Sequence, residues 1–189
     1  EARRDFATLV EEKKDDARAL YALALYLRDN NLYSLALDCG EKIARLATAA
    51  GASDAPRFLW QLRFPTYYAD LVVPESQKNN LDPLIYFALL RQESSFNPWS
   101  TSSADARGLG QVMPATGQGI AKALGVKNYT TDQLYLPHVS IRFGTWYLAQ
   151  DMKTFGEPIY ALAAYNAGTG RVKQWQRPDL DLAVEDVDI

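Results

Sequence analysis

The 189-residue chain contains a single cysteine, Cys39, and a single histidine, His138. One cysteine excludes an intrachain disulfide, and one histidine excludes a metal site built from several imidazoles. Cys39 lies in an apolar helical pattern, which indicates a core residue. We therefore expect no bound metal and no cofactor.

Long apolar runs and an excess of positive charge are missing as well. No stretch reaches the roughly 18 consecutive apolar residues that a membrane-spanning helix needs, and no signal peptide opens the chain. The formal net charge of −3 provides no global basic field for nucleic acid or an anionic membrane. Because the chain does not begin with Met, we expect a mature form or a fragment, and the missing targeting sequence says little about compartment.

Alternating apolar and polar residues, the pattern of a half-buried strand, form no convincing segment, so the sequence predicts a mainly α protein with little or no sheet. Hydrophobic residues make up 48% of the chain, which is enough for a buried core. Residues 3–50 have almost no Gly or Pro, and their apolar residues recur with a helical period on both sides of a turn at residues 29–31. This pattern predicts a helical hairpin of the kind that is stacked in superhelical repeats.

Residues 51–56, GASDAP, are the clearest linker. We expect a helical, solenoid-like segment over residues 1–55 and a second domain over residues 56–189. The aromatic-rich stretch that follows the linker is broken by Pro65 and Pro74, which is typical of a segment that packs across a domain surface.

Three later segments each run from a proline to a glycine, which predicts helices over residues 114–125, 137–156 and 158–168. A short turn is expected at residues 171–175. The helix over 137–156 is expected to bury a set of apolar and aromatic side chains: Val139, Phe143, Trp146, Tyr147 and Phe155.

The most informative helix is predicted to begin at Asp82. Asp accepts the free N–H groups of a first turn, and Pro83 fits there without losing a needed donor. Tyr86, Leu90 and Glu93 lie at i, i+4 and i+7, so the acid shares its stripe with apolar side chains. Burial and the negative end of the helix dipole both favour the protonated acid, so we expect a raised pKa, which suits a general acid. The alternative is an ordinary surface glutamate at a helix end.

Residues 96–98, Phe-Asn-Pro, are expected to stop this helix, because the residue before a proline is pushed out of helical geometry. Three motifs then recur in order: ESSFNP at residues 93–98, ARGLGQVMP at residues 106–114 and AAYNAGTGRV at residues 163–172. Together they resemble the lytic transglycosylases, most closely the catalytic domain of the soluble enzymes, of glycoside hydrolase family 23 type. The resemblance covers roughly residues 62–189. It implies a lysozyme-like α+β domain with little or no sheet, preceded by a helical hairpin from a superhelical linker region.

The resemblance also assigns individual residues. Glu93 matches the family's only catalytic carboxylate, and Tyr165 matches a tyrosine that approaches it. The positions that match substrate-binding residues are Ser94, Ser102, Gln111, Met113, Ala164, Tyr165, Asn166 and Glu185. The sequence departs from the family at Gly110, where the pattern has Met. The family pattern also continues past the region of Glu185, so we expect the domain to be C-terminally incomplete.

The implied activity is cleavage of the β-1,4 bond between N-acetylmuramic acid and N-acetylglucosamine in peptidoglycan, with formation of 1,6-anhydro ends. Glu93 is expected to protonate the glycosidic oxygen and then to accept the proton of the attacking 6-hydroxyl group. The implied partners are peptidoglycan glycan strands and not nucleic acid, and the expected state is a monomer in the periplasm or cell envelope.

Two alternatives are open at the level of sequence. One is a lysozyme-type peptidoglycan hydrolase, in which Asp105, twelve residues after Glu93, activates water. Asp105 lies in a polar loop, where an acid that merely stabilises a turn is the simpler interpretation. The other is a non-catalytic peptidoglycan-binding or scaffold protein that keeps the groove.

Overall fold

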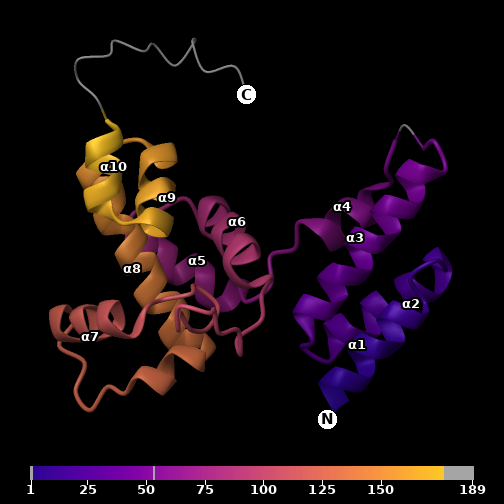
Figure 1. The fold of residues 1–189 in the computed structure, drawn as a ribbon, viewed down its shortest axis with the longest axis horizontal. Helices are drawn as coiled ribbons and strands as arrows, with labels where there is room; N and C mark the ends of the chain where they lie inside the picture. Colours follow the sequence, from indigo (N-terminus) through magenta and orange to yellow (C-terminus); the bar gives the residue numbers. More distant parts are fainter. Residues whose placement is uncertain (1, 53, 177–189) are drawn as a thin grey trace. The chain divides into compact units, whose positions relative to one another are not determined.

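A computed structural model describes residues 2–52 and 54–176 (Figure 1). The described residues are helical: α1 (Ala2–Glu12), α2 (Ala17–Asp29), α3 (Tyr33–Ala49), α4 (Arg57–Arg63), α5 (Ala69–Lys78), α6 (Pro83–Ser94), α7 (Pro114–Ala123), the 3-10 helix η1 (Thr131–Tyr135), α8 (Pro137–Phe155), α9 (Pro158–Ala167) and α10 (Thr169–Trp175). Within this part of the chain no sheet forms, and the only β-type pairings are two isolated bridges centred on Arg107. The mainly α prediction is confirmed.

The chain divides into two compact units, residues 1–145 and 146–189, with α8 running from the first into the second. The predicted boundary between residues 55 and 56 stays a prediction.

The hairpin predicted at the N-terminal end is formed by α2 and α3, which lie side by side (Figure 1). It is extended by two helices that were not predicted separately, α1 and α4. Asp16 separates α1 from α2, because its carboxylate accepts the backbone N–H groups of Arg18 and Ala19 and so caps α2. The shared core is a cluster of buried residues from all four helices: Val10, Leu20, Ala24, Leu27, Ala36, Cys39, Ile43, Leu59 and Leu62.

The expectation for the aromatic-rich stretch was incomplete, because α5 forms there with Pro74 inside it. A proline within a helix removes one backbone hydrogen bond and costs about 3 kcal/mol. The packing of α5 against α6, with Val72 and Ser76 fully buried, offsets this cost. A sequence rule for proline cannot include that packing.

The helix that carries Glu93 begins as predicted. The Asp82 carboxylate accepts the backbone N–H of Leu84 at 2.8 Å, and Pro83 is the first helical residue. Its end differs from the prediction: Ser95 and Phe96 take left-handed φ angles of 50° and 59°, so the helix stops at Ser94, before the Phe-Asn-Pro sequence. Phe96 is 1% exposed, and its burial holds this strained turn in place.

The helices predicted between a proline and a glycine are confirmed as α7, α8 and α9. Gly125, Gly156 and Gly168 follow them with positive φ angles. Two details were wrong. Of the five side chains expected to be buried on α8 only Phe143 is fully buried, and the other four are partly exposed. The predicted turn at residues 171–175 is instead part of the helix α10, which packs on α9.

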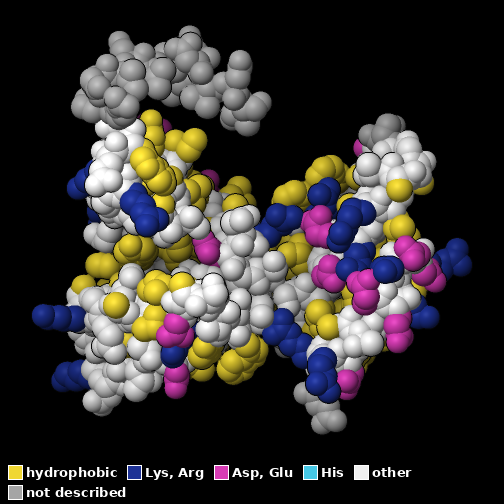
Figure 2. All heavy atoms as spheres, in the orientation of Figure 1, with side chains coloured by type: hydrophobic (Ala, Val, Ile, Leu, Met, Phe, Trp, Pro, Cys, Tyr) yellow, Lys and Arg dark blue, Asp and Glu magenta, His cyan; other side chains and the backbone are white. Residues whose placement is uncertain are grey.

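Charges of both signs are interspersed over the N-terminal helices on the face drawn in Figure 2. This distribution agrees with the small net charge of −3. Among the described residues, no helix combines the length and apolar character needed to cross a membrane.

Candidate active site

Glu93 lies in the last turn of α6, on the stripe that the sequence predicted. Tyr86 and Leu90 on that stripe are 0% exposed, and Glu93 is half-buried. Burial raises the pKa of the Glu93 carboxyl, and among the described residues no cation or hydrogen-bond donor counteracts it. The predicted direction of the pKa shift is confirmed, with burial as its cause.

Tyr86, on the same stripe of α6, interacts electrostatically with Glu93 through its hydroxyl group. It is buried and has no hydrogen-bond partner among the described residues. Burial raises the pKa of Tyr86, and the negative charge of Glu93 raises it further. Tyr86 therefore stays protonated and neutral beside the acid. An ionised Tyr86 would add a second negative charge to a half-buried site.

Arg91, the cation nearest to Glu93 along the chain, is held by groups on α3 and α4. Its Nη2 donates to Glu41 at 2.6 Å and its Nε donates to the backbone oxygen of Arg63 at 2.8 Å. Residues two apart on a helix do not face each other. Arg91 is therefore not available to neutralise Glu93.

Ser94 is buried, and its hydroxyl donates to the backbone oxygen of Leu90 at 3.2 Å. This bond uses the hydroxyl proton within the helix. The structure thus gives Ser94 a local role in the last turn of α6.

The loop between α6 and α7 carries three of the predicted substrate-binding residues, Ser102, Gln111 and Met113. The Ser102 hydroxyl oxygen accepts the backbone N–H groups of Ala104 and Ala106 at 3.2 and 3.0 Å, which leaves its own proton free to donate. The side-chain amide of Gln111 donates to the backbone oxygens at positions 100 and 108, at 3.1 and 2.8 Å. Met113 precedes α7 and is 41% exposed. Gln111 therefore shapes the loop, while Ser102 and Met113 present atoms to solvent.

Two further residues of this loop, Trp99 and Arg107, were not among the predicted site residues. Trp99 is 66% exposed and stacks on Tyr135 of η1, with ring centroids 6.1 Å apart. Arg107 pairs with Asp132 at 2.7 Å and lies over the Tyr135 ring. The partners are more than 20 residues apart in the chain, which is why a local pattern does not reveal them.

Asp105, the residue on which the hydrolase alternative depends, forms a bidentate ion pair with Arg107. Nε and Nη2 of Arg107 donate to its two carboxylate oxygens at 3.0 and 3.1 Å. The Asp105 side chain is 54% exposed, and the residue has a left-handed φ of 67°. This geometry is that of an acid which stabilises a turn.

The Ala-Tyr-Asn motif lies near the end of α9 in the second unit. Ala164 is 0% exposed, Asn166 is exposed, and the half-buried Tyr165 ring packs edge-on against Tyr147 of α8 with centroids 5.3 Å apart. Glu185, the last predicted site residue, lies outside the described residues.

The second unit also contains a buried acid that sequence reasoning missed. Asp151 on α8 is 3% exposed, and one of its oxygens accepts from the Thr169 hydroxyl at 3.0 Å. The other oxygen is buried and has no hydrogen-bond partner among the residues that the structure describes. Burial raises the pKa of Asp151, and the hydrogen bond from Thr169 lowers it less than burial raises it.

Neither a metal cluster nor a reactive thiol accompanies Glu93 in the described part of the chain. No three His, Cys, Asp or Glu side chains lie close enough there to hold a metal ion. Cys39 is buried, and burial raises the pKa of its thiol to about 12, so it stays protonated.

Comparison with known proteins adds independent observations. The family described as "Transglycosylase SLT domain" matches residues 70–185. The chain is 35% identical over 179 residues to the soluble lytic murein transglycosylase of Escherichia coli K12, with 92% of this chain and 25% of the relative covered.

Two solved structures are similar. The crystal structure of the 70 kDa soluble lytic transglycosylase from Escherichia coli has a TM-score of 0.75 and 33% identity, and covers 92% of this chain and 26% of its own. The structure of an inactive mutant of the lytic transglycosylase Slt from Pseudomonas aeruginosa has a TM-score of 0.69 and 34% identity. The match covers 86% of this chain and 25% of the Pseudomonas chain. The chain thus spans about a quarter of the length of the curated relatives it matches.

Proposed function

Because the chain belongs to the transglycosylase SLT domain family, we propose that it cleaves the β-1,4 bond between N-acetylmuramic acid and N-acetylglucosamine in peptidoglycan and leaves 1,6-anhydro ends. The observation that carries the proposal is Glu93: a half-buried carboxyl at a helix end, with a pKa raised by burial and with its neighbouring cation held elsewhere. A raised carboxyl pKa favours the protonated form, which can give its proton to a leaving group.

One carboxyl group, that of Glu93, acts as both acid and base in the proposed reaction. Protonated Glu93 donates its proton to the glycosidic oxygen, and the bond from that oxygen to the anomeric carbon breaks. The acetamido group of the muramic acid sugar stabilises the positive charge on that carbon. Glu93, now a carboxylate, accepts the proton of the 6-hydroxyl group as its oxygen attacks the anomeric carbon. Glu93 ends protonated, as it began, and no water is consumed.

The other predicted residues are proposed to bind and orient the glycan strand. Ser102 has a hydroxyl proton free for a sugar oxygen, and Met113 offers exposed apolar surface. Trp99 is added to the set, because exposed aromatic faces stack on the apolar faces of sugars. The remaining members of the proposed set are Ser94, Gln111, Ala164, Tyr165, Asn166 and Glu185.

Hydrolysis is disfavoured as an alternative because both oxygens of Asp105 are paired with Arg107. The bidentate pair with Arg107 fixes this carboxylate in its turn, which is a structural role. A purely binding or scaffold role is disfavoured by the intact and protonatable Glu93.

We also propose that the protein acts as a monomer on the cell wall outside the cytoplasm, with residues 1–55 as a helical segment ahead of a catalytic domain from residue 56. Relatives named soluble and membrane-bound murein transglycosylases support this location.

Digestion of purified peptidoglycan sacculi, followed by mass spectrometry of the released fragments, tests the proposal. The digest is run with this chain and with a C-terminally extended version. The proposed reaction leaves anhydro ends, which are lighter than reducing ends by one water. Reducing ends would instead establish a hydrolase, and sacculi that are bound without any release would establish a binding protein.

A further inference from the structure

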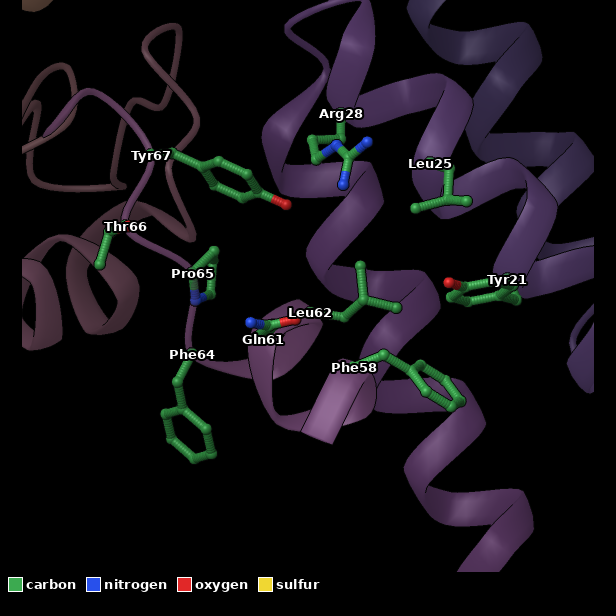
Figure 3. Close-up of a pocket in the computed structure, with 10 residues that line it drawn as sticks. All are labelled: Tyr21, Leu25, Arg28, Phe58, Gln61, Leu62, Phe64, Pro65, Thr66 and Tyr67. Atoms are coloured by element: carbon green, nitrogen blue, oxygen red, sulfur yellow. The ribbon is translucent and has the colours of Figure 1, made fainter. Parts of the chain in front are cut away.

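The first unit contains a pocket of about 510 Å³ that none of the proposed cleavage residues lines. It is formed by α2, by α4 and by residues 64–67, which follow α4 (Figure 3). Its volume falls within the range of roughly 300–1,000 Å³ that is typical of small-molecule sites. The Glu93 chemistry does not account for it.

The charge that lines this pocket is positive. Arg28 is the charged residue of its lining, and no acid lines it in the described part of the chain. The Arg28 Nε donates to Asp29 at 2.8 Å, whereas its two Nη nitrogens make no hydrogen bond to any described residue. Figure 3 shows the guanidinium group pointing into the pocket. A planar group with free Nη donors matches a carboxylate.

Aromatic rings supply the rest of the wall. Phe58 and Phe64 are 42% and 54% exposed. Tyr21 packs edge-on against Phe58 with centroids 4.9 Å apart. Tyr67 is fixed by stacking on Tyr33 at 4.2 Å. The Phe58 ring is therefore held in place and is open to a ligand with an apolar face. The Phe64 ring instead stacks on Trp60 and lies against the guanidinium groups of Arg63 and Arg91.

Four neutral polar groups complete the pocket: the Tyr21, Thr66 and Tyr67 hydroxyls and the Gln61 amide. None of them makes a hydrogen bond within the described residues. Burial raises the pKa of Tyr67 to about 12, and the nearby Arg28 charge only partly opposes this, so its hydroxyl remains a donor at neutral pH. The Gln61 amide can both donate to and accept from an amide such as an acetamido group.

We propose that this pocket is a second saccharide site, which binds an N-acetylated amino sugar bearing a carboxylate. The carboxylate pairs with Arg28, the acetamido group pairs with Gln61, and the sugar face lies against Phe58. N-acetylmuramic acid has this combination of groups, so the identity of the ligand rests on the proposed function. Such a site would hold a glycan strand away from the bond being cleaved.

The test is a titration of the protein with N-acetylmuramic acid, followed by NMR of the backbone amides of residues 58–67. N-acetylglucosamine, which lacks the carboxylate, is the comparison sugar. In the wild-type protein we expect the acid to bind at least tenfold more tightly than the neutral sugar, a ratio that corresponds to about 1.4 kcal/mol. Arg28→Gln is expected to remove this preference and to leave the weaker neutral binding unchanged.

Arg18→Gln is the matched control, because Arg18 is an exposed arginine on the same helix and does not line the pocket. It is expected to keep the preference. The proposal is overturned if the amides of residues 58–67 do not respond, if both sugars bind equally, or if Arg28→Gln keeps the preference. A monosaccharide has no glycosidic bond to cleave, so these outcomes do not depend on whether Glu93 is catalytic.

Discussion

Arg91, two residues before Glu93 on α6, donates from Nη2 to Oε1 of Glu41 on α3 at 2.6 Å. Both side chains are about 30% exposed, so the pair is partly desolvated. Glu41 also pairs with Arg63 at 3.3 Å, and Arg91 lies over the Phe64 ring. The helix that carries the candidate acid is thus tied to α3 through the Glu41 carboxylate and to α4 through the backbone oxygen of Arg63.

Glu41→Gln is predicted to lower the free energy of unfolding by about 1–3 kcal/mol, because two arginines lose a charged acceptor. The pH dependence of cleavage should not change, since Arg91 does not face Glu93. Urea unfolding and a pH profile check these statements. Glu11→Gln is the control, because its ion pairs are exposed and screened by solvent. A shifted pH profile in Glu41→Gln would show that the two sites are coupled.

Trp99→Ala is predicted to raise the KM for glycan strands about three- to tenfold, because a stacking surface worth about 0.5–1.5 kcal/mol is lost. The turnover number should change little, since Trp99 takes no part in proton transfer. Trp99→Phe keeps a ring and should keep most of the affinity. Steady-state kinetics of both variants test this prediction. An unchanged KM in Trp99→Ala would show that Trp99 is not part of the substrate site.

Tyr165→Phe is predicted to reduce turnover about tenfold or more while the Tm changes little. The phenyl ring keeps the edge-on contact with Tyr147, so only the hydroxyl is lost. Tyr147→Phe is the comparison variant on the other side of the same ring contact. Equal losses of Tm and activity in Tyr165→Phe would make Tyr165 a packing residue.

Asp151→Asn is predicted to increase stability at neutral pH. The pKa of Asp151 is raised in the folded protein, so the stability it contributes is present below the unfolded pKa near 3.9 and is lost as pH rises through the folded pKa. Asn removes the buried charge and can still accept from Thr169. Thermal unfolding across pH should therefore give a Tm gain that shrinks in acid. A Tm loss at neutral pH would mean that the carboxylate is needed. Asp132→Asn, at an 83% exposed side chain, is the control.

Local rules were enough to predict the helix from Pro83 and its cap at Asp82, because the cap and the apolar stripe involve residues close in sequence. They failed at Pro74, where tertiary packing outweighs the cost of a proline in a helix. They also failed at Ser95 and Phe96, whose left-handed backbone is held by burial and not by glycine. Each failure arises from a contact made only after the helices pack.

The same distinction between local and long-range contacts applies to the candidate site. The raised pKa of Glu93 could be predicted because its apolar neighbours lie on its own helix. The ion pair from Arg91 to Glu41 joins residues 50 apart in sequence, and the pocket between Arg28 and Gln61 joins two separate helices. No periodicity or short motif reports such pairs, so both required the folded structure.

The central claim is that Glu93 is the only acid and base of the reaction, and Glu93→Gln tests it most directly. Its pKa is raised in the folded protein, so the stability it contributes is lost as pH rises through that pKa. The variant should therefore have a Tm at neutral pH no lower than that of the wild type.

The decisive measurement is the rate at which wild-type and Glu93→Gln proteins release anhydro fragments from sacculi. Loss of the only acid and base is expected to lower this rate by at least about 10²- to 10⁴-fold, the range that general acid–base catalysis contributes. Release of anhydro fragments by Glu93→Gln at the wild-type rate would contradict it.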